Sequence, residues 1–201
     1  MTARDSGFVI NYTGDTSNFN EDLSNSLKAA ESSNDYLKFS MSSLSCTANG
    51  TDGNLNIDVG ATYLTTAQQE AYVNAVVTRA LVSIITPGMT DFQKEKAIHT
   101  WVIKTVSYDY TLANHSAYAA LVAPHKTACQ GYSLLMYKML RQAGITTRIV
   151  SGTLNGEAHA WNKVNIGGNW YNVDATNDDG ANTTRFYNVT DSVLRQHGFA
   201  W

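Results

Sequence analysis

The chain of 201 residues has few charged side chains and no cluster of basic ones. Asp, Glu, Lys and Arg make up 15% of it, and the formal net charge is −3, whereas about a quarter of a typical soluble protein is charged. Because nucleic acids and anionic membranes are bound through patches of Lys and Arg, neither is an expected partner. The polar surface consists instead of Ser, Thr and Asn, a composition that suits an exported bacterial protein.

Long apolar runs are also missing. No stretch of 18 residues is apolar throughout, and the best candidate is interrupted by Arg79, so no insertion into a membrane is expected. Residues 1–5 do not contain the apolar stretch of a signal peptide. We interpret the chain as a mature or trimmed form of an extracellular or cell-surface protein. A cytoplasmic location is the alternative.

Cysteine occurs only twice, as Cys46 and Cys129. Two cysteines form no disulfide framework, and their spacing is not that of zinc ligands. His115, His125 and His197 show no metal-ligand spacing either, so we expect no metal and no other cofactor. Cys46 is interpreted as a small buried side chain, whereas the residues around Cys129 indicate chemistry.

Cys129 lies at the start of a predicted helix. Thr127 and Gln130 form a capping-box pattern, and Gly144 is a helix stop signal about four turns later. In this register Cys129 occupies the first turn, where unpaired N–H groups and the positive end of the helix dipole favour a thiolate. A lone cysteine in such a place is more often an inert core residue, so catalysis requires partners.

A predicted β-hairpin supplies those partners. Strand-like segments flank Gly167-Gly168, which is a signal for a two-residue turn. A turn centred there makes His159 the diagonal neighbour of Asp174, with Cα atoms about 7–8 Å apart. Since a carboxylate at that distance can fix the tautomer of an imidazole, Cys129, His159 and Asp174 are a candidate catalytic triad.

Other residues are candidates for substrate binding or for the oxyanion hole, and each has packing as its alternative role. They are Tyr108, Tyr118, Gln130 and Trp161. His125, four residues before the cysteine, is a competing base, but no carboxylate partner for it is visible.

The chain length fits one domain with a smaller subdomain. Residues 1–64 are predicted to form a small α+β subdomain, and residues 65–201 to form the catalytic domain. A Thr90–Gln93 capping box predicts a helix in the second part, and His99 on that helix is interpreted as a core histidine. A long helix is predicted from Thr65 or Thr66 to Pro87. The remaining predicted elements are strands at 8–12, 37–41, 55–63, 145–153 and 186–189 and helices at 19–30 and 191–197.

Three segments resemble the core motifs of the transglutaminase-like superfamily, in its bacterial protease-like branch. They are Cys129-Gln130-Gly131-Tyr132, the run from His159 to Val164, and the run from Trp170 to Thr176. The resemblance implies an α+β fold with a papain-like core, in which a helix beginning at the cysteine packs on an antiparallel sheet. Many relatives carry Trp where this chain has Asn177, so the wall of the pocket differs.

The same resemblance implies a function and leaves alternatives open. The expected activity is acyl transfer from a protein or peptide carboxamide through a thioester on Cys129, to an amine or to water. A cysteine peptidase or amidase of the same fold is one alternative. A catalytically silent binding module at the cell surface is another. The oligomeric state is not predicted.

Overall fold

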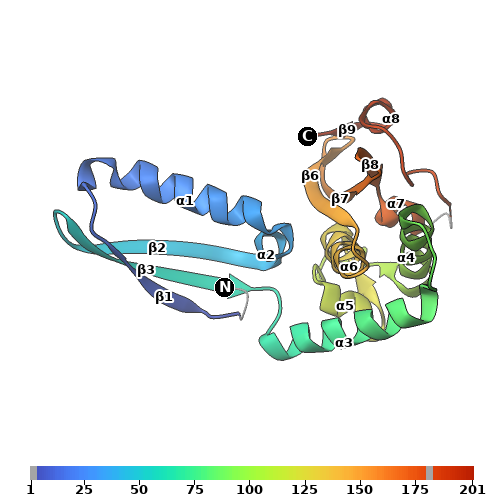
Figure 1. Ribbon diagram of the computed structural model, residues 1–201, viewed down its shortest axis with the longest axis horizontal. Coiled ribbons are helices and arrows are strands. Elements are labelled where there is room, and N and C mark those ends of the chain that lie inside the picture. Colours follow the sequence, from blue (N-terminus) through green and yellow to red (C-terminus); the bar gives the residue numbers. More distant parts are fainter. Residues whose placement is uncertain (1–3, 180–182) are drawn as a thin grey trace. The chain divides into compact units, whose positions relative to one another are not determined.

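The computed structural model of the protein describes residues 4–179 and 183–201 (Figure 1). The chain divides into two compact units, Met1–Ala67 and Gln68–Trp201. Each unit has its own antiparallel sheet, so each is described separately.

The first unit is a three-stranded sheet with helices. Its sheet has the order β1-β3-β2, and α1 runs along it in Figure 1. The elements are β1 (Gly7–Tyr12), a 3-10 turn η1 (Thr16–Asn18), α1 (Phe19–Ser33), α2 (Asp35–Ser40), β2 (Met41–Thr51) and β3 (Asn54–Tyr63).

Two predictions for this unit are wrong. The strand expected at 37–41 is the helix α2, because the side chain of Asn34 accepts the N–H of Leu37 and caps a helical turn there. Cys46 is half-buried rather than buried, since it lies on the edge strand β2 with only one neighbouring strand.

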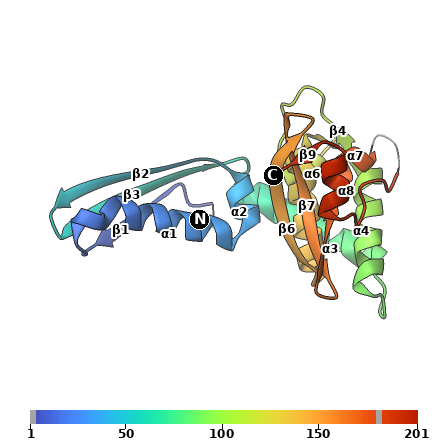
Figure 2. The same cartoon turned by 90° about the horizontal axis from the view of Figure 1, so that it is seen from above.

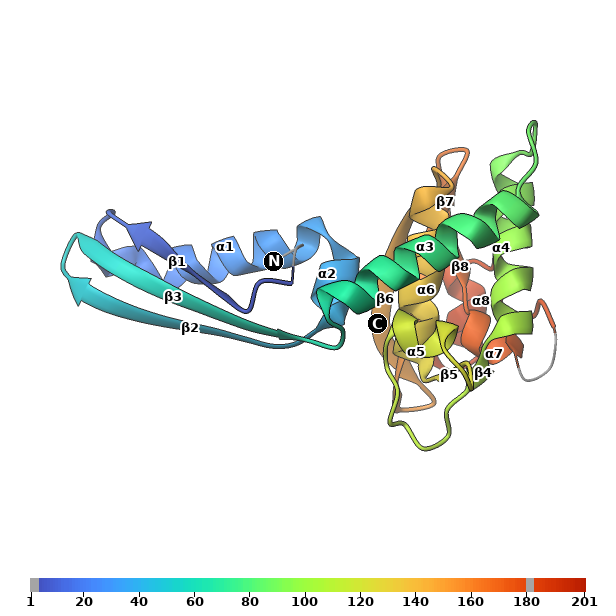
Figure 3. The same cartoon turned by 90° about the horizontal axis from the view of Figure 1, so that it is seen from below.

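The second unit is built around one helix, α6 (Cys129–Gln142), which packs on β6 and β7 of a four-stranded sheet (Figures 1 and 2). The sheet has the order β8-β7-β6-β9. Helices α4, α5 and α7 also contact α6, and α3 crosses α6 on the side away from the sheet (Figure 3). The bounds are α3 (Ala67–Ile84), α4 (Asp91–Thr105), β4 (Ser107–Tyr108), α5 (Ala117–Leu121), β5 (Lys126–Thr127), β6 (Thr146–Leu154), β7 (Glu157–Ile166), β8 (Asn169–Val173), α7 (Ala175–Asp179), α8 (Asp191–Gln196) and β9 (Phe199–Ala200).

The expected β7–β8 hairpin is confirmed. Ile166 pairs with Asn169 and Val164 with Tyr171, and the two turn glycines have φ of +61° and +84°. A turn that needs two positive φ angles matches the right-handed twist of the strands and strongly favours glycine. The register that was inferred from the sequence therefore holds.

Strand β7 is covered on both faces, which explains why so few of its side chains are exposed. Asn162 points to the α6 side, where its amide donates to the carbonyl of Ser133 at 3.1 Å. Trp161 points the other way, because side chains alternate along a strand, and it packs with Phe186, Leu194 and Phe199. The helix and the C-terminal segment thus enclose the strand that carries His159.

The C-terminal segment differs from its prediction. Residues 186–189 form no strand and contribute only one bridge, between Val189 and Asn172. The side chains here bond to the core instead, as Tyr187 and Asn188 both donate to Glu95.

The predicted Thr90–Gln93 capping box is present on α4, and α8 ends one residue before its predicted end.

Candidate active site

The cysteine helix begins where the sequence predicts but is capped differently. Cys129 is the first residue of α6, and its N-cap is Ala128, without a side-chain cap. Thr127 is not the cap because it lies in β5 and its hydroxyl donates to the carbonyl of Asn114 at 3.0 Å. The side chain of Thr127 also lies where a Cβ on Gly131 would be. Glycine at 131 therefore lets the first turn of α6 approach β5.

A short relay of hydrogen bonds fixes the helix against β7. The hydroxyl of Ser133 donates to the carbonyl of Cys129 at 3.0 Å, and the buried amide of Asn162 donates to the carbonyl of Ser133. Asn162 is three residues beyond His159 on the same strand. This relay ties the cysteine turn to the histidine strand.

His159 is held by a carboxylate that is wholly buried. Nε2 of His159 lies 2.8 Å from Oδ2 of Asp174, which has no exposed surface. The other oxygen, Oδ1, accepts the backbone N–H groups of Thr176 and Asn177 at 3.1 and 3.2 Å. Asp174 therefore also caps α7, so the turn that follows β8 sets the direction of its carboxylate.

Cys129 lies close enough to His159 for the two side chains to interact by hydrogen bonding and by charge. Burial of the Cys129 thiol opposes its ionisation. The hydrogen bond and charge of His159 and the N–H of Ala160 outweigh it and lower the pKa of Cys129. Burial likewise opposes a charged His159, but Asp174 and Cys129 raise its pKa to about 10. Both shifts favour a thiolate–imidazolium pair.

Helix α7 is anchored through three consecutive side chains, each to a different partner. Asn177 donates from Nδ2 to Oδ2 of Asp174 at 2.6 Å. Asp178 meets Nε2 of His99 on α4 at 3.0 Å, with both side chains fully buried. Asp179 accepts from the hydroxyl of Tyr132 on α6 at 2.7 Å. These anchors hold the turn that carries Asp174 against two helices, and His99 is a core histidine as predicted.

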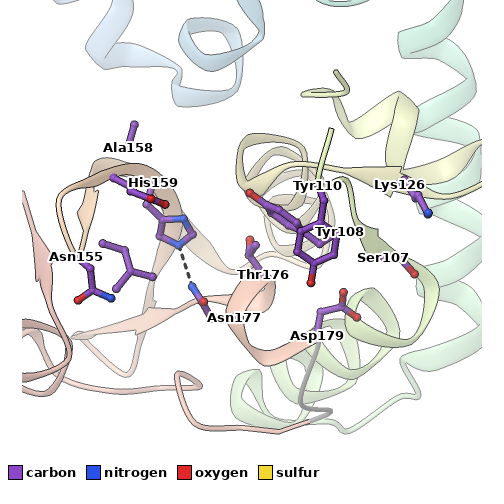
Figure 4. Close-up of a pocket in the computed structure, with 12 residues that line it drawn as sticks. Ser107, Tyr108, Tyr110, Lys126, Asn155, Ala158, His159, Thr176, Asn177 and Asp179 are labelled. Atoms are coloured by element: carbon purple, nitrogen blue, oxygen red, sulfur yellow. Dashed lines mark hydrogen bonds between the residues drawn. The ribbon is translucent and has the colours of Figure 1, made fainter. Parts of the chain in front are cut away.

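A cavity of about 960 Å³ opens in front of His159 (Figure 4). In Figure 4, His159 and Asn155 lie on one side of it, and Tyr108, Tyr110 and Asp179 on the other. The expected loop at 154–157 contributes to the wall. The lining residues are Ser107, Tyr108, Tyr110, Lys126, Leu154, Asn155, Glu157, Ala158, His159, Thr176, Asn177 and Asp179.

Of the four other predicted site residues, two lie beside the triad and two are not part of the cavity wall. Tyr108 lines the cavity and is close enough to Cys129 for their charges to interact. Trp161 lies behind His159 with nearly parallel rings, their centroids 6.0 Å apart. Tyr118 packs edge-on against Tyr72 at 5.6 Å and is not part of the cavity wall, and neither is Gln130. A packing role for Tyr118 is therefore favoured.

The competing base lies apart from this arrangement. Nδ1 of His125 is 3.3 Å from the carbonyl of Ala120. The preference for His159 over His125 thus agrees with the geometry.

Three residues at the site were not identified from the sequence. Asn162 lies within a motif but has no predicted role, Asn177 is predicted only to change the pocket wall, and Asp179 has no predicted role. Adjacent polar residues after a strand, as in 177–179, were the available signal, because such residues often cap and anchor a turn.

Two further observations concern metal binding and membrane spans. Within 4–179 and 183–201, His, Cys, Asp and Glu form no group of three or more that could hold a metal ion. Among the helices in those ranges, none combines the length and the apolar character needed to span a bilayer.

Comparison with known proteins identifies the core. Residues 79–175 match the model of the transglutaminase-like superfamily, and this segment includes the cysteine helix, the histidine strand and Asp174. This segment is therefore similar to the transglutaminase-like superfamily. The transglutaminase-like core thus consists of helices packed on an antiparallel sheet, as expected.

Relatives of the core have different chain lengths. Kyphoscoliosis peptidase from Homo sapiens is 32% identical over an alignment of 104 residues, and the match covers 43% of this chain and 16% of that protein. The Mus musculus protein of the same name is 26% identical over an alignment of 130 residues, and the match covers 56% of this chain and 20% of that protein. A solved structure of a TGase, 17% identical, has a TM-score of 0.45 over 65% of this chain and 43% of its own. The chain thus spans less than half of each of these proteins.

Proposed function

We propose that the chain is a cysteine acyltransferase or hydrolase that acts on protein or peptide carboxamides. The observation that carries this proposal is the continuous contact from Cys129 through His159 to the buried Asp174, at the edge of a cavity large enough for a side chain and its flanking backbone. Charged pairs of this kind are characteristic of activated cysteine nucleophiles.

In the proposed reaction, the thiolate of Cys129 attacks the carbonyl carbon of the carboxamide. A C–S bond forms, the C–N bond breaks, and the imidazolium of His159 gives its proton to the leaving ammonia or amine. An incoming amine or water then attacks the thioester, losing its proton to His159 and releasing the thiol. No net oxidation or reduction occurs.

The negative oxygen of the tetrahedral intermediate needs hydrogen-bond donors. The backbone N–H of Cys129 is one candidate, because it is at the unpaired N-terminal end of α6. Tyr108 is the side-chain candidate, since its ring lines the cavity near the sulfur. Whether an amine or water completes the reaction distinguishes a transglutaminase from a peptidase or amidase.

One experiment separates these activities and tests all of them. The protein is incubated with glutamine-containing peptides and methylamine, and mass spectrometry follows methylamine incorporation, deamidation and backbone cleavage. We expect one of these products with the wild type and none with Cys129→Ala. If the peptides stay unchanged, or if Cys129→Ala gives the same product, the enzymatic proposal fails and the binding-module alternative is favoured.

A further inference from the structure

Asn177 makes a contact that no step of the proposed reaction uses. Its side-chain Nδ2 lies 2.6 Å from Oδ2 of Asp174. The same atom lies 3.2 Å from Nε2 of His159, a contact marked by the dashed line in Figure 4. The same carboxylate oxygen also accepts from Nε2 of His159 at 2.8 Å. Two N–H donors therefore converge on one oxygen, and they are close neighbours of each other.

The orientation of the Asn177 amide follows from its partner. An ionised carboxylate only accepts hydrogen bonds, so the amide group at 2.6 Å from Asp174 must be NH₂ rather than the carbonyl. The positive end of the amide dipole is then aimed at the carboxylate and lies beside the imidazole. It stabilises the anion on Asp174, and it opposes a positive charge on His159.

The other groups in contact with His159 favour its protonated form. Asp174 and Cys129 both raise its pKa through hydrogen bonding and charge, while the charged residues of the cavity wall are Lys126, Glu157 and Asp179. A histidine next to two anions has a raised pKa, so its protonated form is a weaker acid toward a leaving group. A general acid–base works best when it can both take and release the proton near the working pH.

We propose that Asn177 is a positioning residue for the Cys129–His159–Asp174 group: its amide occupies the cavity side of the Asp174 carboxylate and limits how strongly that carboxylate binds protonated His159. This role rests on the proposed function of the triad. Because Asn177 lines the cavity and Asp174 has no exposed surface, the amide also separates the Asp174–His159 bond from the solvent in the cavity.

The test measures the titration of the His159 ring by NMR in a Cys129→Ala background, where no thiolate contributes. The resonance is assigned by its loss in His159→Gln. We expect Asn177→Leu, which has nearly the same shape but no donor, to raise the pKa of His159 by about 0.5–1 unit, a 3- to 10-fold tighter protonation. The pKa of His159 in Asn177→Ala is expected to lie between its values with Asn177 and with Asn177→Leu, because a water molecule can donate to Asp174 in the space that the variant leaves.

A matched control comes from the neighbouring position. Thr176→Val changes another cavity-lining side chain of α7 but keeps the backbone N–H that donates to Asp174, so it should leave the His159 titration unchanged. An unchanged or lowered His159 pKa in both Asn177 variants would overturn the proposal. If Asn177→Leu does not fold, judged by thermal unfolding, Asn177→Ala alone decides between a raised and an unraised pKa.

The His159 titration does not depend on catalytic turnover. Failure of the proposed function would appear as an absence of Cys129-dependent product in the wild type, whatever the titration shows. With intact Cys129, a second readout is available: Asn177→Leu should lower the pH midpoint of Cys129 alkylation, whereas a loss of structure would raise it toward that of a free thiol.

Discussion

Oδ2 of Asp174 lies 2.8 Å from Nε2 of His159, and the same histidine also interacts with Cys129. The carboxylate acts at a distance on the sulfur, because it stabilises the imidazolium that in turn stabilises the thiolate. Three of the predictions below follow from the Cys129–His159–Asp174 contacts or from the residues that support them.

The first prediction concerns the pH dependence of Cys129 alkylation by iodoacetamide, measured in a Cys46→Ala background so that one thiol reacts. The pKa of Cys129 is lowered by its contact with His159 despite burial, so the midpoint of the reaction should lie below the free-thiol value of about 8.5. His159→Ala should move the midpoint upward. His125→Gln is the control and should not move it. A wild-type midpoint at or above about 8.5 would mean that Cys129 is an ordinary thiol.

The second prediction separates the charge of Asp174 from its role as a cap. Asp174→Asn keeps an oxygen for the N–H groups of Thr176 and Asn177, so α7 should remain capped and the thermal midpoint should fall only slightly. The new NH₂ group, however, cannot accept from Nε2 of His159, so the histidine takes the wrong tautomer and loses its counter-charge. We expect turnover to fall by about 10³–10⁴-fold, as a wrong tautomer does in serine proteases, and the Cys129 alkylation midpoint to rise. Turnover near the wild-type rate would make Asp174 a structural residue only.

Local sequence signals predicted the hairpin and the start of the cysteine helix correctly. Gly167 and Gly168 specify a turn through their own backbone freedom, and that turn fixes the pairing of the residues on both sides. The capping box of Thr90 and Gln93 also depends only on residues within one turn. Such features are readable from the sequence because all their determinants lie within a few positions.

The features that were missed depend on contacts across the fold. Thr127 had the right spacing for a cap, but a tertiary bond to Asn114 engages its hydroxyl. The helix α2 is an exception, because its cap by Asn34 is local; the alternation of Leu37, Phe39 and Met41 outweighed that signal in the prediction. The roles of Asn162 and Asn177 follow from which way α6 and α7 face, and no local pattern specifies that direction.

The third prediction concerns a buried carboxylate outside the proposed active site. Glu95 has no exposed surface; its Oε2 accepts from Tyr187 and Asn188, and its Oε1 has no partner among the described residues. Burial raises the pKa of Glu95 to about 7, although the two hydrogen bonds and the charge of Lys96 oppose the shift. Glu95 is therefore protonated more readily in the folded chain than in the unfolded one.

The sign of the effect on stability follows from linkage. As the pH rises from about 4.5 to 7, the unfolded chain loses this proton first, so the free energy of unfolding should decrease, by at most about 3 kcal/mol. Glu95→Gln should abolish this decrease and unfold at a higher temperature than the wild type at pH 8, with little difference at pH 5. Glu157→Gln, at an exposed position, is the control. Equal wild-type and Glu95→Gln profiles across this range would show that Glu95 is not titrating in the folded chain.

The last prediction concerns the support behind His159. The indole N–H of Trp161 donates to Oδ1 of Asn172 at 3.0 Å, and the amide of Asn172 donates to Val189 and to Asp191 at 3.3 and 2.7 Å. Because Asn172 and Trp161 are both buried, Asn172→Ala leaves the indole N–H without a partner and should lower the free energy of unfolding by about 2–3 kcal/mol in urea denaturation. Asn169→Ala, at the exposed turn of the same hairpin, should change it by less than about 0.5 kcal/mol. Adding Trp161→Phe to Asn172→Ala should cost less than Trp161→Phe does alone, since the unpaired N–H is then removed. Strictly additive costs would show that the indole bond contributes nothing to stability, and that Trp161 supports His159 by packing only.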